Sequence, residues 1–66
     1  MIIRINGQEE KIQDVLTLWH LVEQSGYCAD KIVIEYNQRI IAKEEWRKVN
    51  LADHDNIEIV SFVAGG

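Results

Sequence analysis

The last residues of the sequence, Val63-Ala64-Gly65-Gly66, are its strongest candidates for chemistry. Glycine has no side chain and adopts nearly any backbone angle, so Gly65 and Gly66 predict a thin, flexible tail over residues 63–66. The α-carboxyl of Gly66 has a reference pKa of about 3.5 and is therefore an anion at neutral pH. We expect this tail to enter a narrow channel in a partner protein and to offer its carboxylate for a reaction there. The alternative is an ordinary frayed terminus with no function.

The other potentially reactive side chains do not form a catalytic pattern. Cys28 has no basic neighbour in sequence that would lower the pKa of its thiol, so it is predicted to be a small, partly buried filler. His20 and His54 are not accompanied by Cys, Asp or Glu at metal-ligand spacing. Asp53 and Asp55 are interpreted as residues of a polar turn. We therefore expect no enzyme active site, no bound metal and no bound cofactor.

Length and composition indicate one small acidic domain. The chain has 66 residues, 47% hydrophobic and 27% charged, with a formal net charge of −4. Nucleic-acid binding needs clustered Lys and Arg, so the acidic balance argues against it and favours a protein partner with a basic face. No apolar run approaches the ~20 residues of a membrane helix, and the first residues do not resemble a signal peptide. With a single cysteine and no disulfide framework, the chain is expected to be cytoplasmic, with no membrane partner.

The first half of the chain predicts a hairpin followed by a helix. Residues 1–5 are apolar and β-branched, Asn6-Gly7 is a strong signal for a type I′ turn, and residues 8–13 would return as a charged edge strand. The helix is expected over residues 18–25. Its start is marked by Thr17 as N-cap, with Leu16 and Leu21 as a hydrophobic staple, and its end by Gly26.

This helix should bury a stripe of Leu18, Leu21 and Val22, which leaves Trp19 and His20 partly exposed.

The second half predicts three more strands. Residues 31–37 should form a strand with Ile32, Ile34 and Tyr36 inward, followed by a turn and a short strand at residues 40–41. Residues 43–46 resemble one helical turn that brings Trp46 onto the core. Leu51 would be an apolar anchor in a polar loop.

The final strand, residues 57–62, directs Ile57 and Ile59 toward the helix. Glu58, Val60 and Phe62 should therefore lie on the open face of the sheet. With Val63, these three residues are predicted to form the surface to which a partner binds.

At this point the chain resembles the ThiS family, the sulfur-carrier proteins of thiamine biosynthesis. The resemblance covers essentially the whole chain. Its most specific parts are the ending Ala64-Gly65-Gly66 and the segment that runs from Asn37 through two aliphatic residues and a basic residue to Trp46. Ala42 replaces a frequent Pro of the family. His54 replaces a usual Gly, which predicts a positive φ at that position.

The resemblance implies an α+β, ubiquitin-like β-grasp fold: a mixed sheet of four to five strands with one main helix across one face. The first and last strands should pair in parallel in its middle. It also implies that the carboxylate of Gly66 is adenylated by an E1-like adenylating enzyme that uses ATP. A persulfide donor would then convert it to a thiocarboxylate, and thiazole synthase would accept the sulfur. The chain itself would not be an enzyme.

Three alternatives remain open at this stage. The chain could be similar to the small subunit of molybdopterin synthase, which also ends in Gly-Gly. It could be a ubiquitin-like modifier that is conjugated to lysines. It could also be a β-grasp binding module in which Gly65 and Gly66 have no chemical role.

Overall fold

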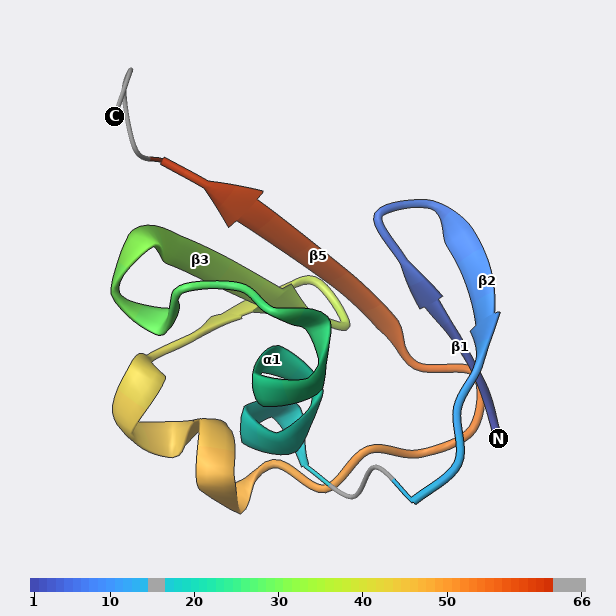
Figure 1. Ribbon diagram of the computed structural model, residues 1–66. Coiled ribbons are helices and arrows are strands. Elements are labelled where there is room, and N and C mark those ends of the chain that lie inside the picture. The colour runs from blue at the N-terminus through green and yellow to red at the C-terminus, as the bar shows by residue number, and fades with distance from the viewer. Residues whose placement is uncertain (15–16, 63–66) are drawn as a thin grey trace.

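The protein is built on a five-stranded sheet in the order β2-β1-β5-β3-β4, with the helix α1 against one face (Figure 1). The computed structural model describes residues 1–14 and 17–62. The strands are β1 (Ile2–Ile5), β2 (Gln8–Lys11), β3 (Ile32–Tyr36), β4 (Arg39–Ile41) and β5 (Asn56–Ser61). The helices are α1 (Leu18–Ser25) and two 3₁₀ helices, η1 (Ala29–Lys31) and η2 (Lys43–Lys48). The predicted α+β architecture is confirmed, and the sheet has five strands where four or five were expected.

The predicted turn joins the first two strands. Asn6 and Gly7 have φ values of 51° and 84°, as a type I′ turn requires. β1 and β2 are antiparallel, and β2 is an edge strand with all four residues exposed. β2 ends at Lys11 instead of residue 13. Ile12 still pairs with Met1 in the same register, because its amide donates to the Met1 carbonyl oxygen at 2.9 Å and its carbonyl oxygen accepts from the Met1 amino group at 3.1 Å.

Helix α1 begins and ends at the predicted residues. The Thr17 side chain accepts a hydrogen bond from the His20 amide at 3.1 Å, which satisfies one of the free amides of the first turn. Gly26 ends the helix with a φ of 79°, in the left-handed region that favours glycine. Leu18, Leu21 and Val22 are buried as the periodicity predicts. Leu16 of the predicted staple lies outside the described residues.

The predicted crossover between the first and last strands is present. β1 pairs with β5 in parallel, with Arg4 opposite Asn56 and Ile5 opposite Ile57. β3 pairs with the other edge of β5 in antiparallel orientation. α1 covers the face of the sheet to which the odd-numbered residues of β1 and β5 point. The core between them consists of Ile3, Leu18, Leu21, Val22, Ile32, Ile34, Trp46, Leu51, Ile57 and Ile59.

The segment from Asn37 to Trp46 has a structural role. Trp46 is 1% exposed, and its indole Nε1 donates to the carbonyl oxygen of Ile41 at 2.9 Å. Asn37 turns the chain with a φ of 48°, and its Oδ1 accepts from the amide of Asn56 at 2.8 Å. The segment therefore ties the β3–β4 turn to the start of β5 and closes the core with an indole ring.

None of the helices in the described ranges is long and apolar enough to cross a membrane.

Candidate functional site

Strand β5 carries the chain toward the predicted tail. It lies between β1 and β3, and Figure 1 shows it running diagonally across the molecule to the C-terminal end. Phe62 continues the pairing one residue beyond β5, because its amide donates to the carbonyl oxygen of Lys31 at 3.0 Å. The predicted reactive residues, Val63, Ala64, Gly65 and Gly66, lie outside the described residues.

The start of β5 is fixed by the side chain of Asp55, which is only 7% exposed. Its carboxylate accepts three hydrogen bonds: from the Tyr36 hydroxyl at 2.6 Å, the Asn37 side-chain amide at 3.1 Å and the backbone amide of Ala52 at 2.7 Å. A buried carboxylate needs such donors to compensate for its lost hydration. The interpretation of Asp55 as an ordinary polar-turn residue is therefore incomplete, because this side chain joins three segments of the chain.

The adjacent residues connect the same loop to β1. Asp53 Oδ1 accepts from the amide of Ile2 at 2.7 Å, and this hydrogen bond is the main reason that the pKa of Asp53 is lowered. His54 has the predicted positive φ, at 70°, and its amide donates to the carbonyl oxygen of Ile2 at 2.6 Å. Together with Asp55, these contacts set where β5 begins and therefore where the tail leaves the domain.

The three predicted binding residues of β5 and its extension are exposed. Val60 is 57% exposed, Phe62 is 58% exposed, and Glu58 is also on the surface. Glu58 and Val60 point away from α1, since Ile57 and Ile59, which alternate with them, are buried beneath it. Alternation places Phe62 on the same side as Val60. The sequence prediction of an exposed apolar face before the tail is confirmed.

The sheet enlarges this face with residues that the sequence analysis missed. Val33 lies directly opposite Val60, and Ile40 of β4 lies opposite Glu35. Val33 is 39% exposed and Ile40 is 71% exposed. The apolar patch is thus formed by Val33, Ile40, Val60 and Phe62, with Glu35 and Glu58 beside it. The outward position of Val33 was predictable, but the strand order that brings it beside Val60 was not.

Cys28 is exposed, so the prediction of a partly buried filler is wrong. The thiol lies in the segment between α1 and η1, where the chain crosses the end of the helix without packing Cys28 into the core. Within the described ranges, no group of three His, Cys, Asp or Glu side chains is arranged to hold a metal ion.

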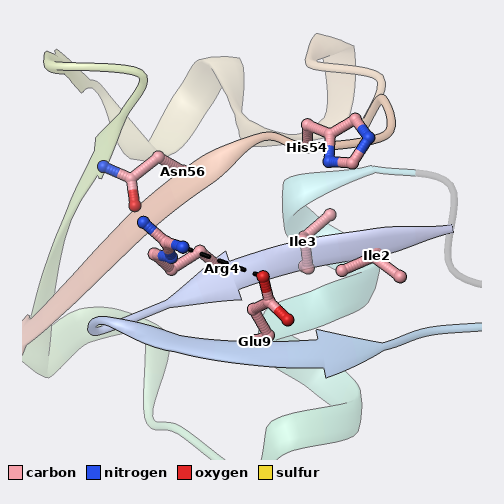
Figure 2. A pocket seen from close by; sticks show the side chains of 6 residues that line it. All are labelled: Ile2, Ile3, Arg4, Glu9, His54 and Asn56. Atoms are coloured by element: carbon pink, nitrogen blue, oxygen red, sulfur yellow. Dashed lines mark ion pairs between the residues drawn. The ribbon is translucent and has the colours of Figure 1, made fainter.

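A shallow hollow on the open face lies near the start of β5, at the opposite end of that strand from the apolar patch (Figure 2). Figure 2 shows Arg4 of β1 reaching toward Glu9 of β2, with a distance of 3.8 Å between Arg4 Nη2 and Glu9 Oε2. His54 and Asn56 lie at its rim. An exposed ion pair of this kind contributes little to stability and places no nucleophile or acid–base pair in the hollow.

Trp19 is partly exposed, as predicted, and packs against η2. The guanidinium carbon of Arg47 lies 4.2 Å from the centre of the Trp19 ring, which is a cation–π arrangement. This contact joins α1 to η2 on the side of the molecule away from the open face. Trp19 therefore stabilises the packing of the helices and does not extend the apolar patch.

The topology and the single covering helix define the class of protein: this is a ubiquitin-like β-grasp domain. The crystal structure of a thiamine biosynthesis protein (ThiS) from Geobacter metallireducens superposes with a TM-score of 0.86. It is 22% identical in sequence and each chain is covered completely, so the likeness concerns the fold.

The sequence comparisons identify the family. The family model described as the ThiS family matches residues 3–66, so the chain belongs to the ThiS family. It is 37% identical to the sulfur carrier protein ThiS of Bacillus subtilis over 71 residues, covering 97% of this chain and 98% of that protein. It is also 34% identical to a thiazole synthase of Paramagnetospirillum magneticum over 62 residues, but this match covers only 19% of that protein's length.

Proposed function

We propose that this protein is a sulfur carrier of thiamine biosynthesis whose reactive group is the carboxylate of Gly66. The observation that carries the proposal is the match to the ThiS family, which extends through Gly66 and includes a sulfur carrier that is similar over nearly its whole length. The β-grasp domain supports the proposal because it leads β5 out of the core toward the tail. The chain is then a macromolecular substrate and not a catalyst.

The chemistry of a carboxylate explains why a partner must activate it. A carboxylate is a poor electrophile because its negative charge is delocalised over two oxygens. In the proposed cycle, a Gly66 oxygen attacks the α-phosphorus of ATP on an E1-like adenylating enzyme, which forms an acyl-adenylate and releases pyrophosphate. The terminal sulfur of a persulfide donor then attacks the carbonyl carbon and AMP leaves. A second thiol cleaves the S–S bond, leaving a thiocarboxylate on Gly66 and a disulfide on the donor side.

Thiazole synthase is proposed as the acceptor of this sulfur. Nearly the whole of this chain is similar to one part of a protein named thiazole synthase. That protein therefore contains a segment like this chain, which supports thiazole synthase as the partner. The apolar patch can serve as the docking surface for this partner, since its four exposed apolar side chains lie on neighbouring strands of the open face. We place the adenylating enzyme on the same surface, with Glu58, Val60, Phe62 and Val63 as contacts.

The test is intact-mass measurement after incubation with ATP, the adenylating enzyme of the source organism and a persulfide source. The unmodified chain should gain the mass difference between sulfur and oxygen, and the gain should be confined to the C-terminal peptide. A chain lacking Gly66 should gain nothing, and Gly65→Val should be blocked by its bulk. Sulfur on Cys28, or equal modification of the truncated chain, would contradict the proposal.

A further inference from the structure

The two edges of β5 have different neighbours along their length. On one side, β3 pairs with β5 over five residues, from Ile57 through Ser61. On the other side, β1 pairs with β5 at Asn56 and Ile57, and β1 ends at Ile5. Figure 1 shows β5 continuing past the β1–β2 hairpin toward the C-terminal end. The last part of β5 is therefore an inner strand on its β3 side and an edge strand on its β1 side.

Asn6 forms hydrogen bonds with the first two backbone groups of this edge, the carbonyl of Ile57 and the amide of Ile59. Its backbone amide donates to the carbonyl oxygen of Ile57 at 2.9 Å. Its side-chain Oδ1 accepts from the amide of Ile59 at 2.8 Å, where the next residue of a longer β1 would have placed a backbone carbonyl. The last hydrogen bond of the parallel β1–β5 ladder is therefore made by the Asn6 side chain, which accepts from the backbone amide of Ile59.

The backbone amide and carbonyl of Ser61 also point to this edge. Consecutive residues of a strand direct their amide and carbonyl groups to opposite sides. Phe62 donates its amide to Lys31 on the β3 side, so Ser61 directs its amide and carbonyl toward the β1 side, as Ile57 and Ile59 do. Ser61 is exposed, and the described part of the chain places no strand beside it on that side.

The edge at Ser61 lacks the protection that β2 has. β2 forms one border of the sheet and carries Glu9, Glu10 and Lys11, charges that oppose pairing with another chain. Ser61 is small and uncharged, and it lies between the exposed apolar residues Val60 and Phe62. In the described part of the chain, the Ile59 carbonyl and the Ser61 amide and carbonyl face this edge with no strand beside them. Backbone groups of this kind beside apolar side chains can bind an extended peptide by strand addition.

We propose that an extended segment of the adenylating enzyme adds to the β1-side edge of β5 as a sixth strand of the sheet, pairing with the carbonyl of Ile59 and with the amide and carbonyl of Ser61. This inference rests on the proposed function, because the occupant is the protein that acts on Gly66. The edge begins directly before the tail, so a strand paired there holds the backbone extended where the chain leaves the domain.

The first experiment is residue-resolved hydrogen exchange by NMR on the full chain, free and saturated with the adenylating enzyme. In the free protein the Ser61 amide should exchange much faster than those of Val60 and Phe62, which belong to the β3 ladder. In the complex it should become protected, with a scalar coupling across its hydrogen bond to a carbonyl of the enzyme. A Ser61 amide that stays unprotected in the saturated complex would overturn the inference.

The second experiment removes the donor chemically. A synthetic 66-residue chain with an N-methyl group on Ser61 keeps every bond to β3 but cannot pair at the edge. Its Kd for the enzyme should rise about tenfold or more, because a hydrogen bond is lost and its acceptor is left buried. The same synthetic chain with an unmodified Ser61 amide is the matched control, and it should bind like the natural chain. NMR spectra of each free variant establish that the fold is retained.

The outcomes separate this inference from the proposed function. If the N-methylated chain binds like the control while Phe62→Asp weakens binding, the enzyme docks on the open face without adding a strand, and the inference is wrong. If the unmodified chain gains no sulfur in the mass experiment, the proposed function itself fails.

Discussion

Asp55 shows how one buried side chain can organise the segment before a functional tail. Its carboxylate accepts from Tyr36, Asn37 and Ala52, so it joins the end of β3, the β3–β4 turn and the loop before β5. Burial and the hydrogen bond to this carboxylate raise the pKa of Tyr36 to about 12. The neutral phenol is therefore favoured in the folded protein.

This shift predicts a loss of stability at high pH. The pKa of Tyr36 is about 12 in the folded state and about 10 in the unfolded state, so the contribution is complete below pH 10. It is lost as the pH rises from 10 through 12, because the unfolded chain releases the proton first. Urea unfolding of the protein and of Tyr36→Phe at pH 9, 10, 11 and 12 checks this. The difference between the two should shrink over that range, and a constant difference would contradict the prediction.

His54, unlike Asp55, affects the fold through its backbone and not through its side chain. Its φ of 70° is in the region that glycine adopts without strain. The contact between its Nε2 and Asp53 Oδ2, at 3.3 Å, is exposed and adds little. We expect His54→Gly to raise the free energy of unfolding by about 0.5–1 kcal/mol, and His54→Ala to lower it. In thermal melts, the melting temperature should be highest with Gly at position 54, intermediate with His and lowest with Ala. Any other order would refute the strain argument.

The structural roles of residues with strong backbone preferences could be predicted from the sequence, whereas contacts between distant residues could not. Asn6-Gly7, Thr17 and Gly26 set their turns and caps locally, and the structure confirms each one. The role of Asp55 depends on a partner 19 positions away, Tyr36, which no local pattern identifies. The exposure of Cys28 likewise depends on how the chain crosses the end of α1.

At the scale of elements, the order of strands decides which side chains meet. Alternation within β5 predicted that Val60 would lie on the open face, and this is confirmed. The crossover that places β5 between β1 and β3 came from the family resemblance, since periodicity within one strand carries no information about its neighbours. For the same reason, Val33 and Ile40 could be assigned to the patch only from the sheet register.

The placement of β5 predicts the effect of changing Asn6. Asn6→Gly keeps the positive φ of the turn but leaves the Ile59 amide without its acceptor at the end of the β1 ladder. The free energy of unfolding should fall by about 1–2 kcal/mol. Asn6→Asp is the matched control, because its carboxylate can accept from the same amide, and it should retain most of the stability. Urea titrations measure both, and equal stability of Asn6→Gly and the unmodified protein would refute the role assigned to Asn6.

At the scale of the whole molecule, one face of the sheet maintains the fold and the other is free for partners. α1 and η2 cover the first face, where the buried Trp46, Leu18 and Ile57 lie. The open face carries the exposed apolar patch on β3, β4 and the last part of β5, and the Arg4–Glu9 ion pair lies near the start of β5. This separation means that substitutions on the open face should affect partner binding with little effect on stability.

Phe62→Asp tests this separation most directly, because Phe62 is 58% exposed and adjoins the tail. A phenyl ring buried on binding contributes about 1.5–3 kcal/mol before entropic costs. Its loss should raise the Kd for the adenylating enzyme about tenfold or more and slow adenylation at low enzyme concentration. The melting temperature should change by no more than a few degrees.

Arg4→Asp is the matched comparison, since Arg4 is exposed on the same face but lies opposite Asn56, at the start of β5. It should alter binding less than Phe62→Asp does. Calorimetric titration and thermal melts of both variants measure the two effects. Unfolding of Phe62→Asp would place Phe62 in the core of the fold, and an equal loss of binding in both variants would show that charge, and not apolar contact beside the tail, governs docking.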